Sequence, residues 1–323
     1  MTKILVTGGA GFIGSNFIHY WLKHHPEDEI LNLDALTYAG NLENLRSIQN
    51  NKRYKFIQGD INDPKIVEKT MQKGIEVVIN FAAESHNDRA IVNPRLFFET
   101  NVLGTQTLLA ASLKKKVKRF HHISTCEVFG DLTLDSAYAF KENDPFSPRT
   151  PYNASKASAN HAVMAYYHTY GLPVTLSHCS NNYGPYQFPE KIIPLFTTNL
   201  LRDKTLPLFK SSQNKREWIH VDDHCQALEA ILLKGKLGQA YNIGTGVEKS
   251  IEEIANFLLA YFHKPVSYKN YIPDRLGHDR RYLLDSTKIK ETLNWQPKIG
   301  FETGLKQTIA WYQENSAWWA PLL

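Results

Sequence analysis

The sequence predicts an α/β fold, a doubly wound parallel β-sheet with a smaller α+β substrate-binding lobe. Three observations lead to this prediction. Short apolar segments alternate with helix-like segments over residues 3–177, a glycine-rich turn joins the first such pair, and polar residues follow the apolar segments at their carboxyl ends. This alternation is typical of a parallel sheet, whose ligands bind beyond the carboxyl ends of its strands.

Composition limits the classes of protein to which the chain can belong. A length of 323 residues suits one large α/β domain with a smaller one, and 42% hydrophobic residues exclude a disordered chain. The three cysteines lack the spacing of a thiolate zinc site, which favours a reducing compartment. With no signal peptide and no membrane-length apolar run, we expect a soluble cytoplasmic protein without a membrane partner.

Charge favours a small anionic partner over nucleic acid. The net charge is only +5, and the densest basic run, residues 114–118, is typical of a solvated helix end before a strand. We therefore expect no nucleic-acid binding, whereas a polyanionic small substrate suits the positive balance. The histidines lack the spacing of metal ligands, so no metal site is expected.

The first strand, Lys3–Thr7, runs directly into a glycine-rich turn and a helix that extends to about His25. Glycines at this spacing let the backbone turn tightly and bring amide groups and a helix N-terminus against a pyrophosphate. The expected cofactor loop comprises Gly8, Gly11, Phe12, Ile13 and Gly14.

A second strand, Glu29–Leu33, ends in Asp34, twenty residues after Gly14. A carboxylate at this point can accept hydrogen bonds from the adenosine ribose and would repel a 2′-phosphate, so the sequence predicts NAD rather than NADP. Two further strands, Lys55–Gln58 and Val77–Phe81, and a helix over 94–115 extend the pattern. The residues after these strands and within this helix that we assign to the cofactor are Asp60, Ile61, Ala82, Ala83, Ser85 and Thr100.

A strand over Arg119–Thr125 and a helix over 152–170 carry the candidate catalytic groups. Tyr152 and Lys156 are one helical turn apart and share a face. A tyrosine has an ordinary pKa of about 10, and we expect Lys156 and a positive nicotinamide to bring the pKa of Tyr152 toward neutrality. Tyr152 can then act as the base for a substrate hydroxyl, and Thr125 can hydrogen-bond that hydroxyl.

After a further strand, Val174–Ser177, the pattern becomes less regular beyond Pro185. Residues 185–218 and 263–297 are rich in loops, whereas 219–234 and 240–243 are expected to return to the main sheet. We assign 1–182 and 216–246 to an NAD-binding domain, and 183–215 and 247–323 to a substrate-binding lobe.

Several stretches resemble the extended short-chain dehydrogenase/reductase family, and within it the nucleotide-sugar dehydratases, essentially from end to end. They are Thr7–Gly14, Asp34–Asn41, Ala82–Arg89, Tyr152–Lys156, Asn181–Pro194, Arg216–His224 and Asp274–Tyr282. The resemblance implies a Rossmann sheet, NAD as a regenerated cofactor and a nucleotide-diphosphate sugar, dTDP-glucose, as substrate. It also implies a homodimer that pairs through the helices near 94–115 and 152–170.

The resemblance further implies oxidation of the sugar at carbon 4, loss of water across carbons 5 and 6, and hydride return to carbon 6. Glu127 stands where the family has the base for carbon 5, and Cys126 stands where it has an aspartic acid that protonates the departing hydroxyl. The implied catalytic set is Thr125, Cys126, Glu127, Tyr152 and Lys156. The implied substrate-binding set is His86, Thr125, Asn181, Glu190, Lys191, Arg216, Arg275 and His278, with Glu190 a candidate acceptor from a pyrimidine N–H.

Departures from the family pattern leave alternatives open. A thiol at position 126 is a weaker acid than a carboxyl, and relatives with Cys-Glu here eliminate water but return the hydride to carbon 4. Asn87 and Phe129 replace a valine and a tyrosine, and the changed segment 209–212 leaves thymine, uracil and cytosine open as the base. A UDP-sugar 5,6-dehydratase or 4-epimerase is therefore the second hypothesis, and a catalytically weak NAD-binding regulator the third.

Overall fold

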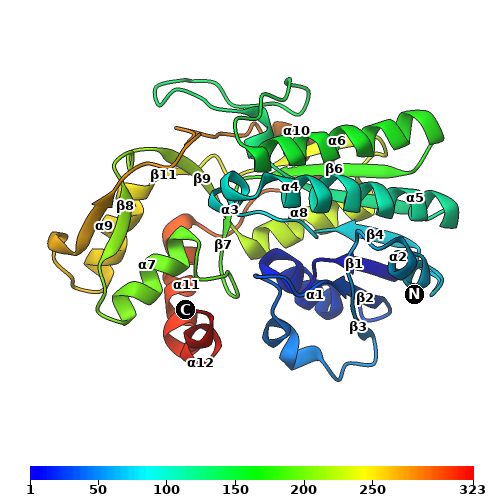
Figure 1. Cartoon of the computed structure of the whole chain (residues 1–323), viewed down its shortest axis with the longest axis horizontal. Helices are drawn as coiled ribbons and strands as arrows, with labels where there is room; N and C mark the ends of the chain where they lie inside the picture. The colour runs from blue at the N-terminus through cyan, green and yellow to red at the C-terminus, as the bar shows by residue number, and fades with distance from the viewer.

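The main sheet has seven parallel strands in the order β10-β6-β5-β4-β1-β2-β3, which confirms the predicted fold class (Figure 1). The computed structural model describes all residues from 1 to 323. The strands of this sheet are β1 (Lys3–Thr7), β2 (Glu29–Asp34), β3 (Tyr54–Gln58), β4 (Val77–Asn80), β5 (Arg119–Thr125), β6 (Val174–Cys179) and β10 (Gln239–Ile243). Because β1 pairs with β2 on one side and β4 on the other, the strand order reverses there, where such sheets bind ligands.

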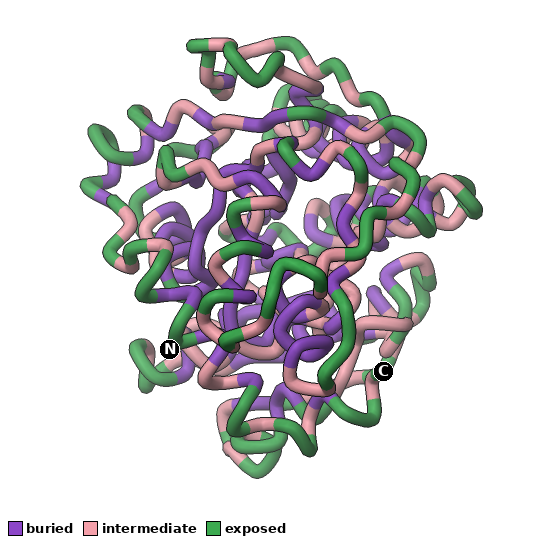
Figure 2. The backbone as a smooth tube through the Cα atoms, turned by 90° about the vertical axis from the view of Figure 1, so that its left-hand side faces the viewer, coloured by how far each residue is buried: buried purple, intermediate pink, exposed green.

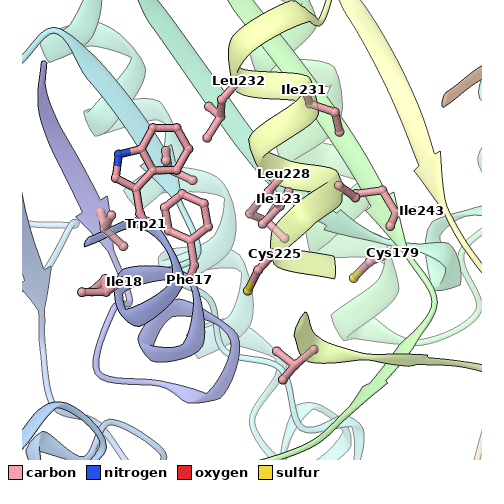
Figure 3. Close-up of a cluster of buried hydrophobic side chains, with 14 of the residues drawn as sticks. Phe17, Ile18, Trp21, Ile123, Cys179, Cys225, Leu228, Ile231, Leu232 and Ile243 are labelled. Atoms are coloured by element: carbon pink, nitrogen blue, oxygen red, sulfur yellow. The ribbon is translucent and has the colours of Figure 1, made fainter. Parts of the chain in front are cut away.

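Helices cover both faces of this sheet, so most residues of its strands are buried, except in the edge strand β3. One face is covered by α1 (Phe12–His24), α8 (Val221–Lys234) and α10 (Thr287–Leu293). Phe17 and Trp21 of α1 lie beside Leu228 and Ile231 of α8 in this layer (Figure 3). The other face is covered by α2 (Pro64–Met71), α5 (Thr105–Lys115) and α6 (Pro151–Tyr170).

The predicted helix over 94–115 is interrupted in the structure. It consists of α4 (Pro94–Phe98), a π-helical segment (Glu99–Gly104) and α5. Within the widened turn the Asn101 amide donates to the Glu84 carbonyl oxygen at 3.0 Å and to the Ser155 hydroxyl at 2.8 Å. These contacts with distant segments compete with regular helix geometry, which explains why the interruption was not visible in the local sequence pattern.

A smaller α+β lobe lies beside the main sheet, as predicted. Its sheets contain β11 (Glu248–Ser250), β9 (Lys215–His220) and β7 (Asn181–Tyr183), and the parallel pair β12 (Lys269–Ile272) and β8 (Leu206–Phe209). Around a separate apolar core, it packs α7 (Ile192–Leu201), α9 (Ile251–Tyr261) and α11 (Phe301–Glu314). The predicted domain boundaries stay a prediction: β9 pairs within the small sheet, and α10 packs on the main sheet.

Short elements connect these layers, with buried residues in the interior of the chain trace and exposed residues at its loops and outer turns (Figure 2). The short helices are α3 (Asn87–Val92) and α12 (Ser316–Trp319), and tighter helical turns occur at Leu42–Ile48, Cys126–Phe129, Val266–Tyr268 and Ala320–Leu322. None of the helices combines the length and apolarity that crossing a bilayer requires.

A buried carboxylate joins the small sheet to the loops beside the main sheet. Glu217 of β9 accepts from the Gly246 amide at 2.7 Å and from the Leu284 amide at 3.1 Å. Burial nevertheless raises the pKa of Glu217 from 4.5 to about 7. Its protonated form is therefore the one that the folded state favours.

This raised pKa predicts a specific dependence of stability on pH. The folded state holds the Glu217 proton more tightly than the unfolded state. The stability that the protonated Glu217 contributes is therefore fully present below about pH 4.5 and is lost as the pH rises to about 7. Glu217→Gln does not titrate, so across this pH range wild type should lose about 3 kcal/mol of unfolding free energy that the variant keeps. Urea unfolding at a series of pH values measures the difference, and parallel profiles for the two proteins would contradict it.

Candidate active site

A single cavity opens at the carboxyl ends of β1, β2, β4 and β5 and brings together most of the residues predicted from the sequence. Those that line it are Gly8, Gly11, Phe12, Ile13, Gly14, Asp34, Asp60, Ile61, Ala82, Ala83, Ser85, Thr100, Thr125, Cys126, Glu127, Tyr152, Lys156, Asn181, Glu190 and Lys191. Four predicted substrate-binding residues, His86, Arg216, Arg275 and His278, are outside this lining.

The glycine loop packs so closely on its own backbone and on the segment after β4 that side chains do not fit at Gly8 and Gly14. Gly8 has a φ of +69°, and a Cβ there would lie 2.6 Å from the Ala82 amide nitrogen. A Cβ on Gly14 would lie 2.4 Å from the Gly8 carbonyl oxygen. No side chain caps the first turn of α1, so its amide groups are free to face an anion. This cradle fits a dinucleotide pyrophosphate.

Asp34, at the end of β2, is held beside this loop by two backbone amides. Its carboxylate accepts from Ala10 and from Leu36, each at 2.8 Å. Burial raises the pKa of Asp34, while these two hydrogen bonds lower it. Because a carboxylate oxygen has further lone pairs, Asp34 can still accept from a ribose hydroxyl, so the residues present fit NAD.

The Tyr–Lys pair lies at the start of α6, whose first turn is capped by Thr150. The Lys156 ammonium donates to the Ile123 carbonyl oxygen of β5 at 2.7 Å, and burial lowers the pKa of Lys156 to about 8. Burial, and next the charge of Glu127, raise the pKa of Tyr152 well above its ordinary value. The expected shift toward neutrality is thus absent in the protein alone, because desolvation of the phenolate dominates.

The segment that follows β5 carries two further candidate catalytic groups. Thr125 accepts from the Glu127 amide at 3.2 Å, which turns the chain so that both Cys126 and Glu127 reach the cavity. Cys126 is also packed among apolar residues, including Phe129 and Tyr282. Burial, with Glu127 as the next cause, raises the pKa of Cys126 well above its ordinary value, so the thiol keeps its proton at neutral pH.

Cationic and imidazole side chains gather beside the cavity. Burial and the charges of Lys191 and Arg275 lower the pKa of His86 to about 4. Burial and the charges of Arg275 and Arg216 lower the pKa of His278 to about 4. Because neighbouring cations contribute to both pKa shifts, the two histidines lie within electrostatic reach of these cations. Of this group, only Lys191 lines the cavity. Such a field favours a ligand with several negative charges.

Two of the predicted substrate-binding residues have protein partners that the sequence did not reveal. Arg216 donates to the Asp279 carbonyl oxygen at 2.8 Å and to the Lys215 carbonyl oxygen at 2.7 Å. Glu190 lies 3.6 Å from a His86 ring nitrogen and lines the cavity that contains the glycine loop. A contact between Glu190 and a pyrimidine base therefore stays a prediction.

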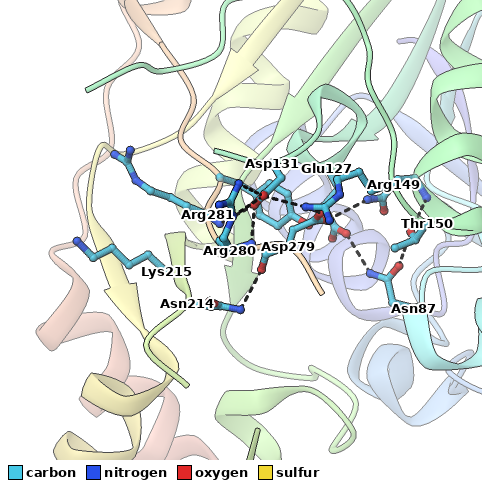
Figure 4. Close-up of polar contacts among 12 residues, drawn as sticks. Asn87, Glu127, Asp131, Arg149, Thr150, Asn214, Lys215, Asp279, Arg280 and Arg281 are labelled. Carbon is cyan, nitrogen blue, oxygen red and sulfur yellow. Dashed lines mark hydrogen bonds and ion pairs between the residues drawn. The ribbon is translucent and has the colours of Figure 1, made fainter. Parts of the chain in front are cut away.

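A network of charged residues links the segment after β5 to the lobe (Figure 4). Asp131 accepts from Arg280 at 2.7 Å and lies 2.8 Å from the Arg149 guanidinium, which lies 3.3 Å from Asp279. The buried Asp279 also accepts from the Tyr282 hydroxyl. These contacts hold residues 279–282 of the lobe close to Cys126 and Glu127.

Several residues of the cavity were missed in the sequence analysis. They are Thr37, Tyr38, Glu84, Ser124, Cys179, Ser180, Asn182, Gln187 and Phe188. Ser124 and Cys179 lie at the carboxyl ends of β5 and β6, Ser180 follows β6, and the others lie in stretches that resemble the family, so these positions were a usable signal. Three side-chain oxygens of the cavity are buried without any hydrogen-bond partner: the Ser124 hydroxyl, the side-chain amide oxygen of Asn181 and one carboxylate oxygen of Glu190. Such atoms are expected in a site that binds a polar ligand.

Comparisons with known proteins agree with this geometry. The family model described as GDP-mannose 4,6 dehydratase matches residues 5–308. Among curated relatives, the dTDP-glucose 4,6-dehydratases of Streptomyces niveus and Mycobacterium tuberculosis are 43% and 45% identical; each alignment covers 99% of this chain, and 95% and 96% of the relatives.

Solved structures extend the same likeness. A dTDP-glucose 4,6-dehydratase from Streptomyces venezuelae with NAD bound is 45% identical, with a TM-score of 0.97 and full coverage of both chains. A UDP-glucose 4-epimerase from Thermotoga maritima is 30% identical, with a TM-score of 0.90, and covers 98% of this chain and 100% of its own. The chain is therefore a member of the GDP-mannose 4,6 dehydratase family of extended short-chain dehydrogenase/reductases.

Proposed function

We propose that this chain converts dTDP-glucose to dTDP-4-keto-6-deoxyglucose and water, with NAD as a cofactor that is regenerated in each turnover. One observation carries the proposal: a single cavity joins the glycine loop and Asp34 to Tyr152, Lys156 and Glu127. Close relatives of nearly equal length are dTDP-glucose 4,6-dehydratases, and one of them binds NAD in its solved structure. These likenesses support the same substrate and cofactor here.

Tyr152 removes the proton from the hydroxyl on carbon 4, and Thr125 hydrogen-bonds the same oxygen. When bound, NAD supplies the hydride acceptor and a positive charge that favours the phenolate of Tyr152. Lys156 holds α6 against β5 through the Ile123 carbonyl oxygen and lies one helical turn after Tyr152 on the same face of α6. The pair therefore serves the redox part of the reaction.

Glu127 removes the proton from carbon 5, which a ketone at carbon 4 has made acidic. Cys126 is the adjacent proton source for the hydroxyl that leaves carbon 6. Because its buried thiol is protonated at neutral pH, it has a proton to give, although it is a weaker acid than a carboxyl. This difference makes Cys126 the residue that most influences the rate of elimination.

The diphosphate of the substrate binds at the basic group beside the cavity. Lys191 supplies a point charge from the lining, and Asn181 supplies an amide there. Arg275, His86 and His278 lie within electrostatic reach of that position. A guanidinium can fork onto two phosphate oxygens, which suits Arg275 and Arg216 to this role. The base of the nucleotide is proposed as thymine on the strength of the relatives.

A cytoplasmic homodimer completes the proposal. The layer that contains α4, α5 and α6 carries exposed apolar residues, including Phe98, Leu103 and Tyr170. Pairing two copies through this layer would remove these side chains from water. The three cysteines are free, which suits a reducing compartment.

Adding a side chain at Gly14 should weaken NAD binding. In Gly14→Ala the new Cβ would lie 2.4 Å from the Gly8 carbonyl oxygen, so the loop must shift away from the pyrophosphate. Overpacking of this kind typically costs about 1–3 kcal/mol, which corresponds to a loss of affinity of roughly 5- to 150-fold. Calorimetric titration with NAD measures the change.

Gly300→Ala is the matched control, because a Cβ there meets nothing within 4 Å. It should bind NAD as wild type does. Equal affinities of the Gly14 variant and the control would contradict the assignment of the glycine loop.

The product formed in heavy water tests the reaction itself. Incubation with dTDP-glucose should yield a 4-keto-6-deoxy sugar with deuterium at carbon 5, because Glu127 exchanges its proton with solvent before reprotonation. Mass spectrometry and NMR identify the product. An exocyclic alkene with carbon 4 still an alcohol, or turnover of UDP-N-acetylglucosamine instead, would sink the proposal in favour of the UDP-sugar alternatives.

Replacing the thiol tests the role of Cys126. Burial raises the pKa of a carboxyl, so Cys126→Asp should present a protonated and stronger acid and accelerate elimination by about 10- to 100-fold. Initial rates of dTDP-glucose dehydration measure the change, and thermal unfolding reports any cost of burying the carboxyl. Cys225→Ala, a buried cysteine between α8 and α1, serves as the control. A drop in the rate of Cys126→Asp at an unchanged thermal midpoint would show that the thiol is specifically required.

A further inference from the structure

Glu127 accepts a hydrogen bond from only one side chain, Asn87 at the start of α3. The Asn87 amide nitrogen donates to a carboxylate oxygen of Glu127 at 3.0 Å (Figure 4). Asn87 is 8% exposed, whereas Glu127 is half-buried and reaches the cavity. The contact joins residues that are 40 positions apart in the sequence. Because the acceptor is a carboxylate, such a bond is stronger than one between neutral groups.

A second hydrogen bond fixes which way the Asn87 amide points. The Thr150 hydroxyl donates to the Asn87 carbonyl oxygen at 2.8 Å and accepts from the Asn153 amide at 3.2 Å, as the N-cap of α6. A reversed amide would place its oxygen against the Glu127 carboxylate and its NH₂ against the Thr150 hydroxyl. Only the observed orientation of the Asn87 amide gives the Glu127 carboxylate a hydrogen-bond donor.

Other ionisable groups surround Glu127 without replacing this donor. Lys191, from the segment before α7, is a cation within its electrostatic reach. The others are Cys126 beside it, Cys179 of β6, Tyr152 of α6, and Asp279 and Tyr282 of the lobe. These groups are acids, and Asp279 adds a repelling charge when ionised. Because the Asn87 amide is uncharged, it can donate to the Glu127 carboxylate without adding a charge to this group of residues.

We propose that Asn87 is the positioning residue for proton removal at carbon 5. Its amide holds the Glu127 carboxylate in place and ties the orientation of that carboxylate to the cap of the helix that carries Tyr152. The base for the elimination and the base for the oxidation are thereby kept in one geometry by the chain Glu127, Asn87, Thr150. This inference rests on the proposed function and deepens it.

Two variants of Asn87 separate positioning from packing. Asn87→Leu has nearly the same size but neither hydrogen bond. Asn87→Asp has the same shape and still accepts from Thr150, but it faces Glu127 with a second carboxylate. Each variant is incubated as the NAD-bound full chain with dTDP-glucose in heavy water. The measured quantities are deuterium incorporation at carbon 5, absorbance of the reduced nicotinamide and the thermal midpoint.

We expect Asn87→Leu to slow incorporation by about 10- to 100-fold, the usual worth of a hydrogen bond to a charged group. Reduced nicotinamide should accumulate, because oxidation at carbon 4 proceeds while proton removal is slow. In Asn87→Asp the acid limb of the pH profile for incorporation should move up by about one pH unit or more, since two adjacent carboxylates resist being ionised together.

Wild-type incorporation and an unchanged pH profile in both variants would overturn the inference. So would an equal loss of oxidation and incorporation, because that pattern indicates a general structural effect. If Asn87→Leu does not fold, the pH profile of Asn87→Asp decides the matter. A wild-type protein that makes no 4-keto sugar rejects the proposed function instead, and this result is distinguishable because it does not involve a variant.

Discussion

The parallel alignment of the central strands is the constraint on which the rest of the structure depends. β1, β2, β4 and β5 all end at one edge of the sheet, so the segments that follow them enclose a common cavity. The Lys156 ammonium then anchors α6 to this edge through the Ile123 carbonyl oxygen. One sheet edge thereby brings the cofactor loop and the acid–base groups together, although long stretches of the chain separate them.

Burial sets the electrostatic character of the site. It raises the pKa of Tyr152 and of Cys126, and it lowers the pKa of His86 and of His278 to about 4. The phenol, the thiol and both imidazoles are therefore neutral near pH 7 in the protein alone. The positive charges of Lys191, Arg216 and Arg275 remain beside them, so an anionic ligand enters a field that already favours it.

The lobe is held to this catalytic edge by charge pairs and buried polar contacts. Asp131, in the segment after β5, contacts Arg149 and Arg280, and Asp279 accepts from Tyr282. These contacts place residues 279–282 against the cluster that contains Cys126. Position 126 thus belongs both to a packed apolar cluster and to the cavity, and a substitution there changes the chemistry and the packing together.

The sequence by itself determined the parallel sheet, the glycine loop, Asp34 and the Tyr152–Lys156 pair. Each of these depends on local periodicity or on spacing within a few residues of a strand end, which a single sequence displays directly. Tertiary structure decided the π-helical turn at Glu99–Gly104, the raised pKa of Tyr152 and the contact between Asn87 and Glu127. These features arise where distant segments meet and exclude water, and neither desolvation nor a long-range contact leaves a local pattern in the sequence.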